Sequence, residues 1–245
     1  MDDTLSPLYK SWLALRSGIF FAGYAGITVF FSLTGMLFLW YLPFRVRGRY
    51  FVMGNQLIVW LLRVVCGVRT KVIGSLPEQG PYVALSKHQS QWETFYLQWY
   101  LFPVTTVLKK ELLSIPFFGW ALRLMNAIGI DRSNPRAALR QTMEQGCDRL
   151  SRGYSVLIFP EGTRVKHGEV GKYARSGAGM AIKAEVPIVA LAHNAGKCWP
   201  AKSLLIRPGT VTLSISPPFD SRGRDVKELN NDVAQWIEHQ CQQIG

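Results

Sequence analysis

A histidine and a glutamate stand five positions apart in the stretch SKHQSQWET, residues 86–94. An imidazole can accept a proton near neutral pH, and a carboxylate beside it can fix its tautomer and stabilise the imidazolium. Ser90 and Glu93 have the spacing of a capping box, which predicts a helix with Ser90 at its N-cap. A turn before that helix would let His88 and Glu93 converge as a general base and its partner. The alternative is an ordinary helix cap preceded by an exposed histidine.

A second polar cluster, FPEGTR, occupies residues 159–164 and follows the apolar run SVLI. Arg164 offers a planar fork suited to phosphate, and Gly162 lets the backbone approach a ligand closely. The alternative is a plain β-turn with an exposed arginine. Arg132 after AIGID is either a second anion contact or a member of a surface ion pair. Lys109, which begins a lysine pair at the end of TTVLK, is either a phosphate contact or an ordinary surface lysine.

Other chemistries find little support in the sequence. No Gly-x-Ser-x-Gly, P-loop, Gly-x-Gly-x-x-Gly or His-Glu-x-x-His motif occurs. The remaining histidines are isolated, and His193, which follows PIVALA, is expected to be structural. The four cysteines are scattered without a Cys-x-x-Cys pair, which predicts neither a metal site nor disulfides and fits a reducing compartment.

The elements that must position these residues alternate between β-rich and helical runs after about residue 69. We expect strands at residues 70–74, 82–86, 105–109, 127–131, 155–159, 187–192 and 210–216. We expect helices at residues 92–102, 116–125, 135–152, 173–184 and 226–243. This alternation predicts an α/β fold with a mostly parallel sheet flanked by helices. Three of the polar clusters directly follow strands, so they should share the rim of the sheet where ligands gather.

The N-terminal part is strongly apolar. No charged residue lies between Arg16 and Arg45, and the run at residues 18–44 exceeds the roughly 20 residues needed to cross a bilayer. A spanning helix and a hairpin-like insertion are both compatible with it. Arg45, Arg47 and Arg49 follow the run and favour a cytoplasmic location for everything downstream.

A shorter apolar segment at residues 50–62 is expected to be an interfacial helix, with Arg63 and Arg69 directed toward lipid headgroups. We therefore divide the chain into membrane-anchoring helices at residues 1–67 and a soluble domain at residues 68–245. The chain has 28 Lys and Arg residues against 16 Asp and Glu, which indicates an anionic partner. The arginines are dispersed and no nucleic-acid-binding signature occurs, so a membrane surface or phosphorylated substrates fit better.

Four ordered blocks, KHQSQWE, KKELLSIPFFGWALRLMNAIGIDR, IFPEGTR and VPIVALAHNAG, resemble the 1-acylglycerol-3-phosphate O-acyltransferase (lysophosphatidate acyltransferase) family. The resemblance covers roughly residues 68–218. The first block of that family is His-x-x-x-x-Asp, whereas this chain has Glu93 at the last position. The substitution keeps the charge and lengthens the side chain by one methylene.

The resemblance implies the roles of individual residues. His88 would deprotonate the hydroxyl of the acceptor, and Glu93 would orient and polarise His88. The glycerol-phosphate head of the acceptor is implied to be held by residues of the second and third blocks: Arg132, Glu161, Gly162, Thr163 and Arg164. The acyl or acceptor pocket is associated with Val186, Pro187 and Ile188. Arg175, within YARSG, is a weaker candidate for substrate binding.

The expected reaction transfers a fatty acyl group from acyl-CoA or acyl carrier protein to the sn-2 hydroxyl of 1-acylglycerol 3-phosphate. Phosphatidate for phospholipid synthesis would result, with no cofactor beyond the acyl donor. No covalent acyl-enzyme is required, and a backbone N–H near Ser90 is a candidate to stabilise the oxyanion. The alternatives are acylation of another lysophospholipid or a lyso-aminolipid, and a non-catalytic, membrane-anchored lipid-binding module. The expected location is the inner or cell membrane, with the catalytic domain cytoplasmic.

Overall fold

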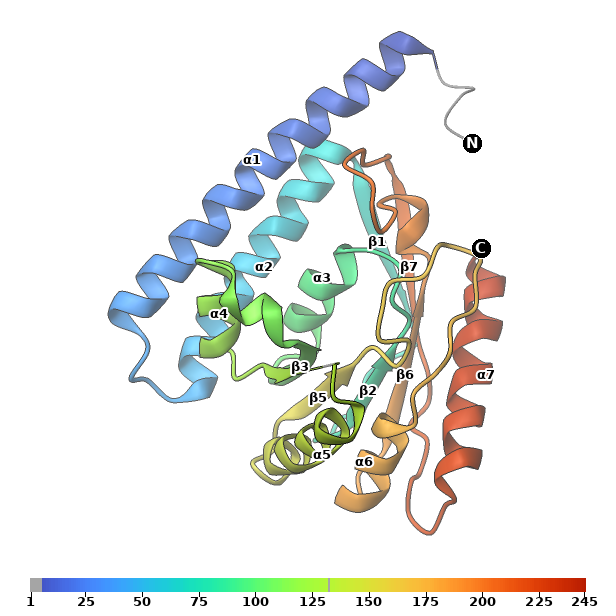
Figure 1. Ribbon diagram of the computed structural model, residues 1–245. Helices are drawn as coiled ribbons and strands as arrows, with labels where there is room; N and C mark the ends of the chain where they lie inside the picture. The colour runs from blue at the N-terminus through green and yellow to red at the C-terminus, as the bar shows by residue number, and fades with distance from the viewer. Residues whose placement is uncertain (1–5, 132) are drawn as a thin grey trace.

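The computed structural model describes residues 6–131 and 133–245 of the chain. Its centre is a seven-stranded sheet in the order β1-β7-β6-β2-β5-β3-β4, seen edge-on in Figure 1. The strands are β1 (Val68–Ile73), β2 (Val83–Ser86), β3 (Val104–Lys109), β4 (Ile128–Ile130), β5 (Ser155–Ile158), β6 (Ile188–His193) and β7 (Gly209–Ile215). Five neighbouring strands are parallel, whereas β7 is antiparallel to β6 and β1 is parallel to β7.

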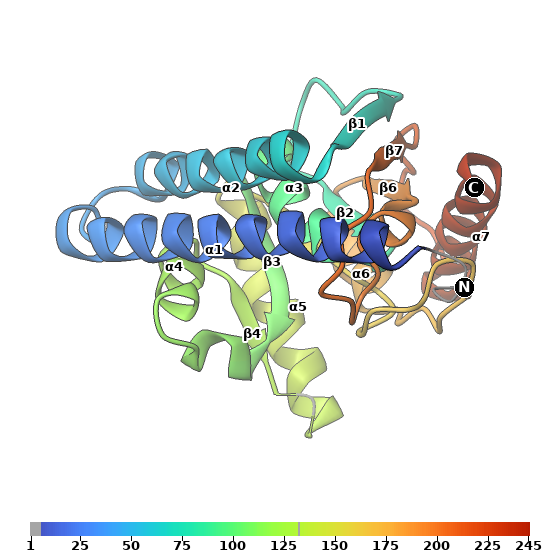
Figure 2. The same ribbon diagram turned by 90° about the horizontal axis from the view of Figure 1, so that it is seen from above.

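Helices cover both faces of the sheet (Figures 1 and 2). One face carries α1 (Pro7–Phe38), α2 (Phe44–Cys66) and α3 (Trp92–Tyr100), and the other carries α5 (Pro135–Ser151), α6 (Ser176–Ala184) and α7 (Val226–Ile244). The short α4 (Phe118–Leu124) packs beside α1. Two 3₁₀ turns, η1 (Lys110–Ser114) and η2 (Ala195–Lys197), complete the described elements.

The two helical layers explain the apolar composition of the central strands. In β2, the buried Ala84 faces the cluster formed with α1, α2 and α3, whereas Val83 and Leu85 face the cluster formed with α6 and α7. A strand that is covered on both faces needs apolar residues at every position. The predicted fold class, a mostly parallel sheet flanked by helices, is confirmed, and every expected strand and helix of the soluble part is present within a few residues of its expected bounds.

The first helix differs from the expected apolar segment. Ser6 caps α1, because its hydroxyl accepts a hydrogen bond from the N–H of Tyr9, and Pro7 occupies the first turn. The helix therefore includes Lys10 and Arg16 and ends at Phe38. Residues 39–43 form the connection to α2, so the uncharged run is shared between two helices and the turn that joins them.

The pair α1 and α2 packs closely through glycines. A Cβ atom at Gly35 of α1 would lie 2.3 Å from the ring of Phe51 on α2. A Cβ atom at Gly54 of α2 would lie 3.0 Å from the ring of Phe31 on α1. Each glycine thus leaves room for an aromatic ring of the other helix, which fixes the two helices against each other.

The helix pair also belongs to the core of the sheet domain. Phe20 of α1 meets Trp199 edge-to-face with ring centroids 5.4 Å apart, and Tyr24 meets Phe95 of α3 at 5.3 Å. Arg47 donates from Nε to the carbonyl of Leu124 at 2.7 Å, so this arginine ties the start of α2 to α4. The boundary at residue 67 coincides with the end of α2, but its division of the chain into two separate units stays a prediction.

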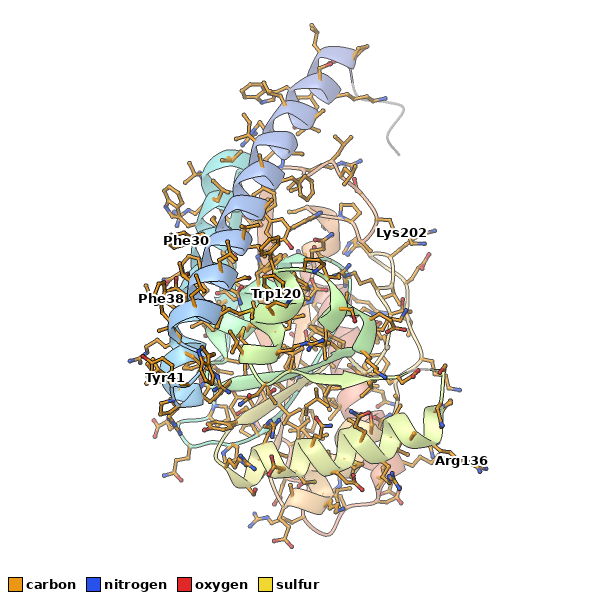
Figure 3. The ribbon with its side chains drawn as sticks, turned by 60° about the vertical axis from the view of Figure 1, so that its left-hand side comes forward. Phe30, Phe38, Tyr41, Trp120, Arg136 and Lys202 are labelled. Atoms are coloured by element: carbon orange, nitrogen blue, oxygen red, sulfur yellow. The ribbon has the colours of Figure 1, made fainter. Side chains whose placement is uncertain are left out.

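The outward faces of α1 and α2 are apolar and exposed. By length and composition α1 could cross a membrane, and 22% of its most apolar 18-residue window is buried. Phe30, Phe38 and Tyr41 lie on the outer side of this helix pair in Figure 3. Exposed apolar side chains continue along both helices: Trp12, Ile19, Leu33 and Leu37 on α1, and Met53, Leu57, Trp60 and Val64 on α2.

Candidate active site

His88 lies two residues beyond the end of β2 and faces the first turn of α3. Its Nδ1–H donates to Oε1 of Glu93 at 2.9 Å, and its ring stacks on Phe159 with the centroids 4.2 Å apart. The turn between β2 and α3 therefore brings His88 and Glu93 together, as the sequence predicted. Because Glu93 engages Nδ1, Nε2 is the ring nitrogen that can accept a proton.

The carboxylate of Glu93 is fully buried and bound to the backbone. Its Oε1 also accepts hydrogen bonds from the N–H groups of Gln89 at 2.9 Å and Ser90 at 2.8 Å. Burial raises the pKa of Glu93, but His193, His88 and the Ser90 N–H lower it, and the net pKa is below its usual value. Glu93 is thus held as a carboxylate, the form that stabilises an imidazolium.

The capping box is present with one difference in detail. Glu93 binds back to the N–H of Ser90, but the hydroxyl of Ser90 accepts from the N–H of Trp92 at 3.2 Å. The first helical residue is Trp92, with Gln91 at the N-cap, one residue later than expected.

Three backbone N–H groups near Ser90 donate to buried carboxylates. Those of Gln89 and Ser90 donate to Glu93, and that of His88 donates to Oε2 of Glu161 at 2.8 Å. The Ser90 N–H itself is thus engaged with a buried carboxylate, and an oxyanion donor elsewhere near the start of α3 stays a prediction.

The FPEGTR turn adjoins His88 because β5 pairs with β2. The N–H of Val165 donates to the carbonyl of His88 at 2.9 Å, which fixes the turn against the histidine loop. Gly162 has a φ of +68°, a conformation that favours glycine, and Thr163 is exposed. The Glu161 side chain has 0% exposure and forms an ion pair with Lys87, with Oε1 2.7 Å from Nζ. Glu161 thus stabilises the loop that contains Lys87 and His88.

Arg164 belongs to the loop that adjoins the dyad. Its Nε is buried and has no hydrogen-bond partner among the residues that the structure describes. The guanidinium lies close enough to Tyr24 of α1 for the charges of the two side chains to interact. Since Arg164 directly precedes Val165, whose N–H donates to His88, its backbone lies at the same rim of the sheet.

Other predicted binding residues lie elsewhere. Lys109 ends β3, which is separated from β2 by β5, and its Nζ is 3.3 Å from the carboxylate of Glu111. Arg175 lies near Asp225, whose pKa it helps to lower, at the start of α7. Arg132 lies outside the described residues.

The fourth sequence block is also remote from the dyad. Val186, Pro187 and Ile188 precede or begin β6, and the carbonyl of Pro187 accepts from the N–H of Val83 at the start of β2. They therefore lie at the opposite edge of the sheet from His88, which follows the end of β2. The structure does not bring this block to the dyad.

His193, at the end of β6, lies close to the pair, with its Nε2 3.9 Å from Oε2 of Glu93. Its Nε2–H donates to the carbonyl of Lys87 at 2.9 Å, and its Nδ1 accepts from the N–H of Ala195 at 3.3 Å. Burial lowers the pKa of His193 below its usual value. These bonds agree with the structural role that the sequence suggested. Lys87 was not singled out from the sequence, although it directly precedes His88.

Comparisons with known proteins show the family of the chain. A family model described as Acyltransferase matches residues 68–194. The 1-acyl-sn-glycerol-3-phosphate acyltransferase of Pseudomonas aeruginosa is 46% identical over 211 residues, which cover 83% of this chain and 81% of that protein. The 1-acyl-sn-glycerol-3-phosphate acyltransferase alpha of Mus musculus is 30% identical over 200 residues, 77% of this chain and 70% of that one.

A solved structure shares the fold. The 1-acyl-sn-glycerophosphate acyltransferase of Thermotoga maritima superposes with a TM-score of 0.73 at 22% identity, over 97% of this chain and 96% of that one. The family model, the identity to the bacterial relative and the four ordered sequence blocks agree with one another. The chain belongs to the 1-acylglycerol-3-phosphate O-acyltransferase family.

Proposed function

We propose that this enzyme transfers a fatty acyl group from an acyl thioester, acyl-CoA or acyl carrier protein, to the sn-2 hydroxyl of 1-acylglycerol 3-phosphate. The product is phosphatidate. The observation that carries the proposal is the His88–Glu93 pair beside the buried, unpartnered Nε of Arg164. The names of the relatives support the choice of acceptor.

The chemistry follows from the orientation of the imidazole. Nε2 of His88 takes the proton of the acceptor hydroxyl as its oxygen attacks the carbonyl carbon of the thioester. The carbon–sulfur bond then breaks, and the departing thiolate takes the proton from the imidazolium. Glu93 stabilises the positive charge that the ring carries between these two transfers. The side chain of Glu93 does not itself need to touch either substrate.

Arg164 binds the phosphate group of the acceptor. A guanidinium can bind a phosphate through two parallel hydrogen bonds, and the Nε of Arg164 has no partner among the described residues. Fixing the phosphate places the glycerol hydroxyl relative to His88 and turns a two-substrate encounter into a positioned reaction.

The first helix suggests how the lipid acceptor reaches the site. Tyr24 of α1 lies near Arg164, while the outward face of the α1–α2 pair is apolar and exposed. Contacts from Phe20 to Gly35 hold α1 along the domain, which favours a helix pair lying in the membrane surface over a helix that crosses alone. We place the domain on the cytoplasmic side of the inner or cell membrane, where the chain, with a net charge of +12, would meet anionic headgroups.

The experiment incubates the purified enzyme in detergent with labelled acyl donors and a panel of lysolipids. We expect phosphatidate from 1-acylglycerol 3-phosphate, and a loss of at least about 10²-fold in kcat for His88→Ala. The matched control is His239→Ala, since His239 is an exposed histidine on α7. Undiminished activity of His88→Ala would overturn the assignment of the general base. Binding without turnover of any lysolipid would instead favour a non-catalytic module.

Arg164 is tested separately. Arg164→Ala should raise the KM of the acceptor more than that of the donor, because the arginine holds the acceptor phosphate. Arg136→Ala, at an exposed arginine on α5 (Figure 3), is the control. Equal effects on the two KM values, or preferred acylation of a lyso-aminolipid that lacks phosphate, would contradict this role.

A further inference from the structure

The lysine that precedes the catalytic histidine is buried, and its ammonium group contacts three oxygen atoms. Lys87 is 1% exposed, and its Nζ lies 2.7 Å from Oε1 of Glu161, 2.6 Å from Oε1 of Glu238 and 3.0 Å from the carbonyl of Glu169. The contacts with Glu238 and Glu169 are hydrogen bonds, and the contact with Glu161 is an ion pair. The position of the Lys87 side chain is therefore tightly constrained, because any displacement would leave the buried ammonium or its carboxylate partners unpaired.

The same cluster is connected to the backbone of His88. Glu161 binds Lys87 through Oε1 and accepts the His88 N–H through Oε2 at 2.8 Å. One carboxylate therefore holds two consecutive residues, one by its side chain and the other by its backbone. A shift of Glu161 would move the histidine relative to Glu93.

The third member comes from the far end of the chain. Glu238 lies on α7, 151 residues after Lys87, and its Oε1 also accepts from the hydroxyl of Tyr173 at 2.7 Å. The preceding residue, Ile237, is buried in the core with Leu229 and Val233 of the same helix. The helix is thus packed firmly against the sheet, and Glu238 projects from a rigid support.

Burial and ion pairing act on the pKa of Lys87 in opposite directions. Burial lowers the pKa of Lys87, but the carboxylates of Glu161 and Glu238 raise it, and the net pKa is above its usual value. The lysine therefore remains protonated. The hydroxyl of Tyr173 completes the surroundings of Glu238 as a neutral donor.

We propose that Lys87, Glu238 and Tyr173 form a positioning cluster through which the C-terminal helix α7 sets the His88 loop for catalysis. Glu161 links the cluster to the backbone of His88. None of the three proposed residues needs to touch a substrate. The inference rests on the proposed function, because it assumes that His88 is the general base.

Two mild variants test the cluster. Glu238→Gln keeps the shape of the side chain but removes its charge, and Tyr173→Phe removes one hydroxyl. We expect kcat to fall about tenfold in Glu238→Gln and less in Tyr173→Phe, with the KM of each substrate within about twofold, because loose positioning slows the reaction without weakening binding. Glu228→Gln, an exposed carboxylate on the same helix, is the matched control and should retain full kcat.

A double variant separates positioning from stability. Lys87→Met and Glu238→Leu break the same link, so we expect the kcat of the double variant to be no lower than that of Lys87→Met alone. We also expect its thermal unfolding temperature to lie above that of Lys87→Met, since no carboxylate of α7 is left facing an apolar side chain. If both the kcat and the unfolding temperature of the double variant returned to the wild-type values, the cluster would contribute only to stability, and the positioning role would be refuted.

The outcomes distinguish this inference from the proposed function. If His88→Ala abolishes phosphatidate formation while Glu238→Gln and Tyr173→Phe keep full kcat in folded protein, the positioning role is refuted and the general base stands. A rise in KM at unchanged kcat would also refute it. If His88→Ala is fully active, the proposed mechanism fails, and the inference fails with it.

Discussion

Glu93 has two roles in the site, because it binds the backbone of the turn as well as the ring of His88. One of its oxygens accepts from the imidazole and from two consecutive backbone N–H groups, those of Gln89 and Ser90. The same carboxylate therefore shapes the turn and orients the ring. The family resemblance has an aspartate here, and the structure shows that the longer glutamate still reaches Nδ1 at 2.9 Å because the turn folds around it.

The charge of Glu93 is tested by Glu93→Gln. The amide oxygen can accept the same hydrogen bonds, but the negative charge that stabilises the imidazolium is lost, so we expect kcat to fall about 10²-fold. Free energies of unfolding from urea titration in detergent should fall by about 1–3 kcal/mol, since buried bonds to a charged acceptor are weakened. A kcat within about twofold of wild type would show that orientation alone suffices.

The buried His193 gives a prediction for pH. Its folded-state pKa lies below the usual 6.5, so below pH 6.5 the unfolded chain binds a proton that the folded chain does not. Stability should thus be constant above about pH 7 and should fall as the pH drops from 6.5 toward the lowered folded-state pKa, by at most about 1.4 kcal/mol per pH unit for each histidine. Burial lowers the pKa of His167 as well, so it contributes in the same window.

Urea unfolding at several pH values checks this. His193→Gln should flatten the curve between pH 5 and the usual histidine pKa of 6.5, whatever its effect on stability at pH 8. Glu93 does not contribute there, because the usual pKa of its carboxyl is 4.5 and the fold lowers it further. An unchanged slope in His193→Gln would assign the acid sensitivity to other groups.

At this scale the sequence predicted what is local. His88, Ser90 and Glu93 lie within six residues, so the geometry of one turn decided their arrangement. The role of Glu161 could not be read in the same way, because its partner Lys87 lies 74 positions earlier and the pairing depends on β2 lying next to β5. The pairing of Glu238 with Lys87 could not be predicted either, because these residues are 151 positions apart.

Among the elements, the glycines between α1 and α2 fix the shape of the helix pair. At Gly35 a Cβ would lie 2.3 Å from the buried ring of Phe51, so Gly35→Ala must push the helices apart. We expect a loss of about 1–3 kcal/mol in stability, seen as a lower thermal unfolding temperature in detergent.

The same helix contains its own control. A Cβ at the exposed Gly26 meets nothing within 4 Å, so Gly26→Ala should leave stability unchanged or raise it by up to about 1 kcal/mol through helix propensity. If Gly35→Ala were as stable as Gly26→Ala, the close packing of the two helices would not be important for the fold.

The strands and helices themselves were largely predictable because each carries its own pattern. Runs such as SVLI and IVALA are apolar throughout, as strands covered on both faces require. The bounds of α1 were missed because hydropathy marks apolar residues, whereas the helix begins at the cap formed by Ser6 and Pro7. The reversed direction of β1 and β7 has no local signal, since strand direction is set by how the whole sheet is assembled.

For the molecule as a whole, an apolar surface and an active rim lie next to each other. The exposed aromatic and aliphatic side chains of α1 and α2 form one face, and Arg164 lies beside α1 through Tyr24. A lipid acceptor in the bilayer would then have its headgroup near the cation and its tail among the helices. Membrane docking should therefore affect access to the acceptor without affecting the chemistry.

The double variant Phe30→Glu/Trp60→Glu tests this separation. Both side chains are more than half exposed, at 59% and 58%, so the fold should persist. Burying each in lipid would contribute about 1.5–3 kcal/mol, and the variant should bind anionic vesicles at least about tenfold more weakly in co-sedimentation. Activity on acceptor presented in vesicles should fall in parallel, whereas activity on detergent-dispersed acceptor should stay within about twofold.

Leu139→Glu is the matched control, because Leu139 is 52% exposed on α5, which covers the opposite face of the sheet. Its vesicle binding and both activities should match those of the wild type. Equal vesicle binding by all three proteins would contradict the assignment of the α1–α2 face to the membrane. Loss of activity in detergent as well as in vesicles would mean that these helices shape the site itself. The proposal that they deliver the acceptor from the membrane would then be contradicted.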